Sequence, residues 1–262
     1  MAKTRLDTLL VERGLFESRS RAAAAVIAGE VMLGQERRRA DKPGQLVTGD
    51  LPVEVVGGPP FVSRGGVKLA NALEKLGFDP TDRRALDVGA STGGFTDCLL
   101  QRGAASVVAL DVGYGELHWR LRNDPRVTVM ERTNARELDC AALPYRPDLV
   151  VADVSFISLE KVLPAVLACA AERFDCLALV KPQFEVGRER VGKGGVVREA
   201  AARRDALASV GRFAVEQGWT LLGFASSELP GPAGNRESFA WIAEGGRPGG
   251  VQPEAAALEV EP

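Results

Sequence analysis

Residues 85–100 of the chain read ALDVGASTGGFTDCLL. The apolar residues 85–88 predict a short buried strand, the glycine-rich residues 89–94 predict a tight turn, and residues 95–100 predict the start of a helix. A strand that enters a helix through such a turn forms the corner at which open α/β sheets bind nucleotides, because glycine has no Cβ atom to keep a ligand from the backbone. The stretch therefore predicts a doubly wound, Rossmann-like α/β domain with helices on both faces and a nucleoside cofactor at this corner.

The residues of this corner favour S-adenosylmethionine over NAD. The turn lacks the G-x-G-x-x-G spacing that binds a pyrophosphate. It has instead the entry Asp87-x-Gly89 and the pair Gly93-Gly94. A cationic sulfonium cofactor has no phosphates to bind, so it needs close backbone approach and carboxylates. Asp87 can also simply brace the turn by accepting backbone N–H bonds, and the two interpretations are compatible.

Polar residues follow the other apolar strands of the predicted sheet. Residues 106–110 lead to Asp111, residues 127–131 precede Asn134, residues 148–152 lead to Asp153 and residues 175–180 lead to Lys181, while residues 238–243 predict a seventh, antiparallel strand. The carboxyl ends of the strands form the crevice in which open α/β sheets bind ligands. We therefore expect cofactor contacts from Asp87, Gly89, Ala90, Ser91, Thr92, Gly94, Phe95, Asp111, Asn134 and Asp153.

The residues after the fourth strand favour oxygen as the methylated atom. Residues 153–156 read DVSF rather than the Asn/Asp-Pro-Pro-aromatic motif of amine methylation, and the chain has no Pro-Cys pair for methylation of a pyrimidine carbon. A ribose 2′-hydroxyl needs a base that removes or holds its proton. Lys181 can act as this base if burial and a neighbouring cation such as Lys68 favour its neutral amine, with Asp153 and Glu237 orienting the amines. These four residues are the predicted catalytic set.

The first 57 residues predict a small α+β unit of two helices and a sheet. Leu6, Leu9 and Leu10 have helical spacing, a second helix starts near Ser18 or Ser20 and runs to residue 28, and residues 31–33 and 51–56 predict strands. Nine basic and eight acidic residues leave the segment about neutral, so RNA binding would need basic residues on one face. The strings RLDTLL at 5–10 and SRSRA at 18–22 resemble the RNA-binding domain first seen in ribosomal small-subunit protein four. That resemblance implies phosphate contacts by Arg5, Arg19 and Arg21, and a merely solvated helix face is the alternative.

Longer motifs extend the resemblance over residues 4–243. They read SRGG at 63–66, GASTGGFT at 89–96, DVGYG at 111–115, VADVSFISL at 151–159 and LVKPQFE at 179–185. With the order Lys68, Asp153, Lys181 and Glu237, the chain resembles the FtsJ-like ribose 2′-O-methyltransferases and, among them, the TlyA family. The resemblance implies S-adenosylmethionine-dependent methylation of cytidine 2′-hydroxyls in ribosomal RNA, with ribosomal RNA or ribosomal subunits as partners and a further RNA contact at Arg64. The segment GKGG at 192–195 predicts a mobile lid whose Lys193 faces RNA, and a flexible loop is the alternative. The alternatives are a membrane-acting haemolysin, a label that the family carries, and a non-catalytic RNA-binding factor of ribosome assembly.

The composition is that of an ordinary soluble protein, with 33 Lys plus Arg against 35 Asp plus Glu among 262 residues. No run approaches the roughly 18 apolar residues of a membrane span, and the start lacks a signal peptide's apolar stretch. We therefore expect a cytoplasmic protein without stable membrane association. The four cysteines (Cys98, Cys140, Cys169 and Cys176) have no C-x-x-C spacing and predict reduced, inert thiols. With a single histidine in addition, no metal site is expected.

The predicted organisation has four parts. They are an RNA-binding domain at 1–58, a linker with the helix that carries Lys68 at 59–81, a methyltransferase domain at 82–244 and a disordered tail at 245–262. The boundary rests on the Gly and Pro residues at 57–60, and the tail on its Gly, Pro and Glu content. Leu69, Leu73 and Leu76 predict a helix to residue 77 with Lys68 in its first turn, where a cation opposes the helix dipole. A monomer and a homodimer both remain open.

Overall fold

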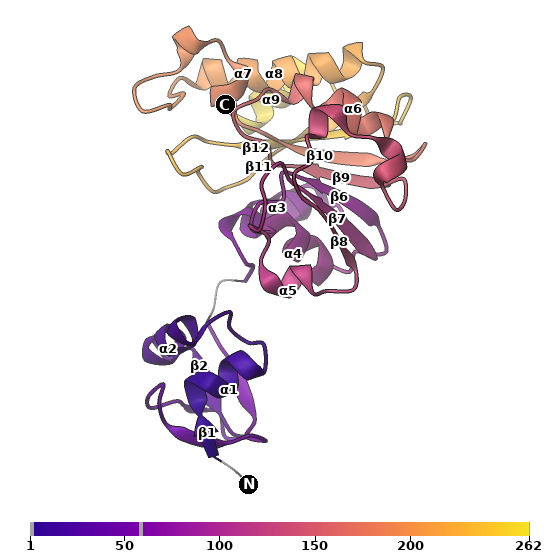
Figure 1. Ribbon diagram of the computed structural model, residues 1–262. Coiled ribbons are helices and arrows are strands. Elements are labelled where there is room, and N and C mark those ends of the chain that lie inside the picture. The colour runs from indigo at the N-terminus through magenta and orange to yellow at the C-terminus, as the bar shows by residue number, and fades with distance from the viewer. Residues whose placement is uncertain (1–2, 58–59, 262) are drawn as a thin grey trace. The chain divides into compact units, whose positions relative to one another are not determined.

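Figure 1 shows a computed structural model that describes residues 3–57 and 60–261. The chain divides into two compact units that meet between residues 60 and 61. Residue 58, the last of the predicted RNA-binding domain, and residue 59, the first of the predicted linker, lie outside the described residues, and so do residues 1, 2 and 262. Each unit has its own hydrophobic core, so each is described by itself.

The first unit contains the two predicted helices, α1 (Leu6–Glu12) and α2 (Arg19–Ala28). Ser18 caps α2 by accepting a hydrogen bond from the Arg21 N–H, and Gly29 ends it in the left-handed conformation. Strand β2 (Val31–Leu33) pairs with β3 (Arg38–Arg39) and β5 (Val53–Val55), and β1 (Lys3–Arg5) pairs with β4 (Leu46–Thr48). The helices and the strands at β2 and β5 confirm the prediction. Strands β1, β3 and β4 were not predicted.

The second unit is built on a seven-stranded sheet. In spatial order its strands are β11 (Thr220–Ser226), β12 (Ser238–Ala243), β10 (Asp175–Val180), β9 (Leu149–Ala152), β6 (Arg84–Val88), β7 (Ser106–Leu110) and β8 (Val127–Met130). Strand β12 runs antiparallel to both of its neighbours, and the strands from β10 to β8 are parallel. The predicted doubly wound sheet with an antiparallel seventh strand is confirmed. Strand β11 was not predicted, and its register shifts between Leu221 and Gly223, which breaks the alternation.

Alternate side chains of the buried strands enter two different cores. On β10, Cys176, Ala178 and Val180 face one core, and Leu177 and Leu179 face the other. The first core is covered by α6 (Leu163–Ala168), α8 (Ala200–Glu216) and α9 (Pro253–Val260). The second is covered by α3 (Arg64–Leu76), α4 (Gly94–Gln101) and α5 (Trp119–Arg122). Figure 1 shows these helices on opposite faces of the sheet.

Short helical segments complete the second unit. Helix α7 (Pro182–Glu185) follows β10 directly, and single 3-10 turns lie at Ala135–Glu137, Cys140–Ala142, Leu159–Lys161 and Arg188–Arg190. Strand β6 lies between β7 and β9, so the order of the sheet reverses there. The carboxyl ends of β6 and β9 therefore form the crevice in which such sheets bind ligands.

The predicted disordered tail is wrong for residues 245–261. Residues 253–260 form α9, Ala256 and Ala257 are buried against the first core, and Glu261 is 5% exposed. Glu261 pairs with the buried Arg203 at 2.8 Å. The Gly and Pro residues before 253 dominate the composition of the segment, and they hid a short apolar helix behind them.

The prediction of four inert, reduced thiols is wrong for two cysteines. Cys140 and Cys169 form a disulfide that joins a 3-10 turn after β8 to the end of α6. The two cysteines are 29 residues apart, and this separation matches no recognisable motif. The disulfide therefore becomes visible only in the folded chain. Cys98 and Cys176 are free and buried as expected, and burial raises the pKa of the Cys98 thiol to about 12.

The Arg203–Glu261 pair provides a test of how much α9 stabilises the fold. Replacing Arg203→Met leaves the buried Glu261 carboxylate with only the more distant Arg236, at 3.8 Å, so we expect the free energy of unfolding to fall by about 3 kcal/mol. The control is Arg212→Met on the same helix, whose exposed pair with Glu254 also joins α8 to α9 and should matter by less than about 1 kcal/mol. Urea titrations of both variants measure the difference, and equal losses would show that α9 is not held by this buried pair.

Candidate active site

The crevice at the end of the central strands contains a pocket of about 440 Å³. It lies where β6, β9 and β10 end, and α3 and the segment before β12 close it. All four predicted catalytic residues line it, as does the predicted RNA contact Arg64. So do eight of the ten predicted cofactor contacts, namely Asp87, Gly89, Ala90, Ser91, Thr92, Gly94, Phe95 and Asp153.

The four charged residues of the pocket form two ion pairs. Lys68 Nζ lies 2.5 Å from Glu237 Oε2, with side-chain exposures of 9% and 1%. Lys181 Nζ pairs with Asp153 Oδ1 and donates a hydrogen bond to Ser155 Oγ at 2.8 Å. Each amine is therefore directed by a carboxylate, which supports the expected orienting roles of Asp153 and Glu237. The roles themselves stay predictions.

These side chains converge because strand ends and a helix face the same crevice. Asp153 and Lys181 directly follow the parallel strands β9 and β10, which pair in register. Lys68 comes from α3, which begins at Arg64. Lys68 therefore lies one turn further into the helix than predicted, where the dipole argument has little force. Its burial is explained instead by the pair with Glu237.

The glycine-rich turn is shaped by close backbone contacts. Gly89 has φ +82°, and a Cβ there would lie 2.4 Å from the carbonyl oxygen of Asp153. A Cβ at Gly94 would lie 2.2 Å from Ser63 Oγ and 2.8 Å from the Gly66 nitrogen. Side chains are therefore excluded at both positions by the protein itself. Because Gly89 and Gly94 have no Cβ atom, their backbone is also open to a ligand on the pocket side.

Asp87 lies beneath this turn and is buried. Its Oδ2 accepts hydrogen bonds from the Thr96 N–H at 2.9 Å and the Thr96 hydroxyl at 2.6 Å. Its Oδ1 has no partner among the described residues. Burial, with further contributions from the charges of Asp153 and Asp111, raises the pKa of Asp87 to about 7 despite the bonds from Thr96. Asp87 thus braces the turn, lines the pocket and keeps one buried oxygen without a partner among the described residues.

Two predicted cofactor contacts lie outside the pocket lining. Asp111 accepts backbone N–H bonds from Ser91 and Gly113, each at 2.7 Å, and Asn134 Oδ1 accepts one from Arg136. Asp111 thereby holds the turn of Ser91, and Asn134 caps a 3-10 turn. A carboxylate oxygen can accept a second hydrogen bond, so a contact from Asp111 to sugar hydroxyls stays a prediction.

Sequence reasoning missed three polar side chains at this site. Glu116 accepts a hydrogen bond from Ser91 Oγ at 3.0 Å, Ser155 contacts Lys181, and Ser63 lines the pocket. Ser155 and Ser63 stand inside the quoted motifs, which could have drawn attention to them. Glu116 follows no strand end, so no pattern indicated it.

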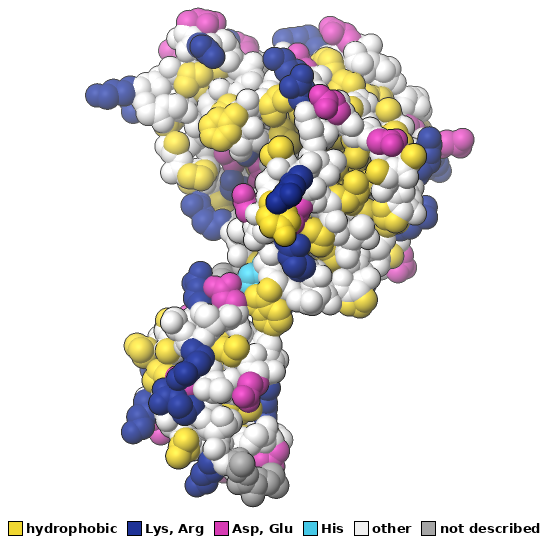
Figure 2. Space-filling view, viewed as in Figure 1, with side chains coloured by type: hydrophobic (Ala, Val, Ile, Leu, Met, Phe, Trp, Pro, Cys, Tyr) yellow, Lys and Arg dark blue, Asp and Glu magenta, His cyan; other side chains and the backbone are white. Residues whose placement is uncertain are grey.

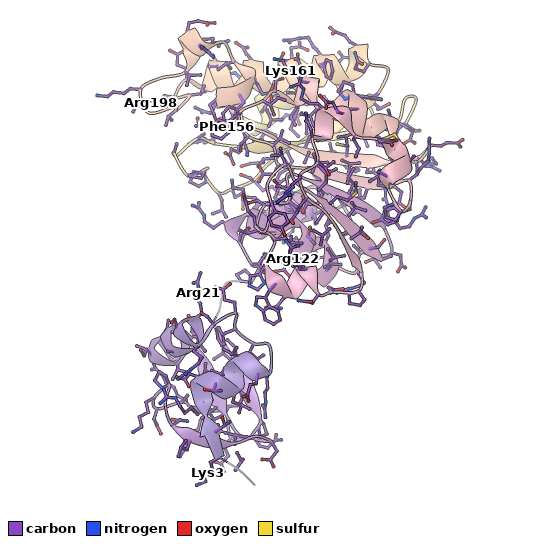
Figure 3. All side chains as sticks on the ribbon, viewed as in Figure 1. Lys3, Arg21, Arg122, Phe156, Lys161 and Arg198 are labelled. Carbon is purple, nitrogen blue, oxygen red and sulfur yellow. A yellow bond between two sulfur atoms is a disulfide. The ribbon has the colours of Figure 1, made fainter. Side chains whose placement is uncertain are left out.

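An exposed aromatic residue follows the Asp153–Ser155 segment. Phe156 is 91% exposed and has φ +63°, and its ring centroid lies 5.3 Å from that of Phe184. The segment is held by Glu185, which accepts hydrogen bonds from Ser158 Oγ and the Leu159 N–H. Burial raises the pKa of Glu185. A strained backbone that presents an aromatic ring to solvent is a feature of functional sites, and Figure 3 labels this residue on the second unit.

Two of the predicted RNA contacts of the first unit, Arg5 and Arg19, pair with one buried carboxylate. Asp7 accepts bonds from Arg5 at 2.7 Å and 3.1 Å and pairs with Arg19 at 3.4 Å. The Arg5 hydrogen bond holds the pKa of Asp7 at about 2. Arg5 and Arg19 thus share one anchor, although 49% and 59% of their side chains stay exposed.

The other predicted RNA contacts, Arg21, Arg64 and Lys193, are exposed, and Arg64 also contacts the loop that closes the pocket. Arg21 pairs with Glu17 at 3.1 Å, and Lys193 lies in an exposed turn. Arg64 donates a hydrogen bond to the Pro230 carbonyl at 2.9 Å. Figure 2 shows Lys and Arg side chains over the visible face of the first unit, with fewer acidic side chains among them. The contacts to RNA stay predictions.

Comparison with known proteins identifies the family. A family model described as FtsJ-like methyltransferase matches residues 61–243, which include the whole pocket. The chain belongs to the FtsJ-like methyltransferases. A Mycobacterium tuberculosis relative named 16S/23S rRNA (cytidine-2′-O)-methyltransferase TlyA is 52% identical and covers 92% of this chain and 90% of its own. The resemblance to the TlyA family is thereby confirmed.

Two further relatives carry the haemolysin label. Hemolysin A of Brachyspira hyodysenteriae is 37% identical over 90% of this chain and 98% of its own. A solved Streptococcus thermophilus structure, designated a candidate hemolysin, is 39% identical with a TM-score of 0.73 and covers 99% of this chain and 96% of its own.

Membership of the methyltransferase family implies S-adenosylmethionine as the methyl donor. No described helix has both the length and the apolar character to cross a membrane, and no cluster of three metal-binding side chains occurs among the described residues.

The raised pKa of Asp87 predicts a pH-dependent stability. Folded Asp87 keeps its proton up to about pH 7, whereas an unfolded carboxyl releases it near 3.8. The contribution of the raised pKa of Asp87 to the free energy of unfolding is therefore complete below pH 3.8 and is lost as pH rises through about 7. Chemical denaturation between pH 5 and 8 should show a fall in unfolding free energy that is absent in Asp87→Asn. Parallel curves for the two proteins would contradict the assignment.

Proposed function

We propose that this protein transfers the methyl group of S-adenosylmethionine to the ribose 2′-hydroxyl of cytidine in 16S or 23S ribosomal RNA, or in both. The observation that carries the proposal is the meeting of two lysine–carboxylate pairs in one pocket beside the glycine-rich turn. The name of the Mycobacterium tuberculosis relative supports this substrate and atom. The proposal places the protein in the cytoplasm, where ribosomal RNA is found.

The pocket fits a cationic nucleoside cofactor. Asp87 keeps an unpartnered buried oxygen, and the backbone from Gly89 to Thr92 is open to the pocket. Asp153 adds a second carboxylate. These residues, with Gly94, Phe95 and Asp111, would hold the cofactor. When bound, it supplies a methyl group on a positively charged sulfur, a donor that needs little further activation.

The contribution of the chain to catalysis is chiefly positioning. Lys181, directed by Asp153 and Ser155, would hold the 2′-oxygen. Once its amine has lost its own proton, it would accept the hydroxyl proton as that oxygen attacks the methyl group. The Lys68 ammonium and the Glu237 carboxylate would form a second charged pair on the other side of the substrate. Aligning the attacking oxygen with the methyl group accounts for a large part of the expected rate gain.

Phe156 would hold the base of the target nucleotide. Its ring is exposed, lies next in sequence to Ser155 and packs against Phe184. RNA readers commonly splay a base out of its stack and place it on an aromatic side chain. In the first unit, Arg5, Arg19 and Arg21 would contact RNA phosphates, and Arg64 and Lys193 would do so near the pocket.

The alternative functions predict different results for one variant. A lytic protein or an RNA-binding assembly factor would keep its activity in Lys181→Met. We expect this variant to lose methyl transfer by about a hundredfold or more because the proton acceptor is gone. Cofactor affinity, measured by calorimetry, should change little. Lys161→Met, an exposed lysine labelled in Figure 3, is the matched control and should keep full activity.

The role of Phe156 is tested with Phe156→Ala. Loss of stacking should raise the KM for ribosomal RNA by about tenfold, the lower part of the range for one stacked base. Phe156→Trp should restore binding because it keeps an aromatic face. Leu258→Ala, another exposed apolar residue, serves as the control. An unchanged KM in Phe156→Ala would remove the ring from the substrate site.

A further inference from the structure

Asn235 is a buried residue in an otherwise exposed loop. Its relative exposure is 1%, whereas residues 232–234 and 236 are exposed. Its Oδ1 accepts a hydrogen bond from the Val197 N–H at 2.9 Å, and its Nδ2 donates one to the Gly195 carbonyl at 2.8 Å. Its own carbonyl accepts one from the Gly231 N–H at 2.8 Å. Asn235 therefore joins two loops that are about 40 residues apart in sequence.

The partner loop, residues 192–198, is fixed from a second direction. The N–H of Gly192 donates to the Val196 carbonyl, which closes the loop on itself. The buried Arg203 on α8 donates hydrogen bonds to the Val197 carbonyl at 3.4 Å and the Arg198 carbonyl at 2.7 Å. Because Glu261 holds Arg203, the partner loop is anchored to the body of the unit.

The loop that contains Asn235 also positions Glu237. A Cβ at Gly231 would lie 2.3 Å from Glu237 Oε1, so the backbone at residue 231 lies against the carboxylate. The Glu237 carbonyl accepts a bond from the Ser227 N–H at 3.0 Å. A shift of residues 231–235 would therefore press on the carboxylate or release it, and would alter the Lys68–Glu237 pair.

We propose that Asn235 is a positioning residue that ties residues 192–198 to residues 231–237 and so holds the Glu237 carboxylate against Lys68. The part of the proposal that concerns catalysis rests on the function proposed above. Lys193 and Arg198 are exposed on the partner loop, and Figure 3 shows Arg198 extending away from the second unit. RNA phosphates that bind these cations would act on the same tie, so substrate contact and alignment of Glu237 are coupled.

Kinetics of matched variants test the proposal. Asn235→Ala removes the tie, and Gly231→Ala displaces the same carboxylate from the other side. Each should lower kcat for methyl transfer to ribosomal RNA by about tenfold or more, because small displacements at a reacting centre are costly. The KM for the cofactor should stay within about twofold in both. Ala233→Ser lies in the same loop outside the pocket lining and should match the parent protein.

A double-mutant cycle separates action through Glu237 from a general structural effect. In a Glu237→Gln background, Asn235→Ala and Gly231→Ala should cause almost no further loss of kcat. If the loss of kcat in each double variant equals the product of the losses in the two single variants, the proposal is wrong. Asn235→Asp can still accept from Val197 but cannot donate to Gly195, so it should fall between the parent and Asn235→Ala. If Asn235→Ala fails to fold, Asn235→Asp decides, because it removes only the bond to the Gly195 carbonyl.

Hydrogen exchange gives a readout that does not depend on activity. The amide of Val197 should exchange faster in Asn235→Ala than in Ala233→Ser. Unchanged exchange would overturn the tie itself. Faster exchange together with full activity of Glu237→Gln would instead overturn the catalytic role of Glu237, and with it the function proposed above for this pocket. Faster exchange with an inactive Glu237→Gln and a fully active Asn235→Ala would overturn the positioning role alone.

Discussion

The close approach of Gly89 to the Asp153 carbonyl is the constraint on which the site depends. Parallel pairing of β6 with β9 brings the ends of these two strands together. A side chain at residue 89 would collide with the Asp153 carbonyl, where the chain leaves β9. The contact sets the path of the glycine-rich turn and the direction in which Asp153 leaves β9. Asp153 in turn directs Lys181. Because Gly89 has no Cβ atom, the glycine-rich turn can lie against Asp153, and Asp153 orients the amine of Lys181, which is expected to accept the proton.

Charge is balanced within the pocket except at Asp87. Lys68 with Glu237 and Lys181 with Asp153 form neutral pairs, and buried ions require such compensation. Asp87 has no cationic partner, and its raised pKa reflects burial beside other carboxylates. A cation bound beside Asp87 would stabilise the charged form of this carboxyl group, so the site favours a ligand that carries a positive charge. The electrostatics and the glycine backbone therefore point to the same class of cofactor.

Sequence reasoning located the strands and the charged residues because both depend on local patterns. Parallel strands buried on both faces appear as apolar runs, and the polar residues that follow them must share one edge of the sheet. Lys68 and Glu237, 169 residues apart, were placed in one set by the chemistry expected of a ribose hydroxyl, but no sequence pattern predicted that they pair with each other. The Cys140–Cys169 disulfide, helix α9 and the role of Glu116 depend on long-range packing that leaves no period or spacing. Gly223 hid β11 because a bulge interrupts the alternation that identifies a strand.

The exposed ring of Phe156 has a consequence for inhibitor design. The cofactor pocket of a methyltransferase is shared in outline with many enzymes, so compounds confined to it discriminate poorly. Ser155 lines that pocket, and the next residue presents an aromatic face outside it. A compound that fills the pocket and extends a flat heterocycle over this face would gain a contact with an aromatic residue outside the pocket lining. Such bridging compounds offer a route to selectivity.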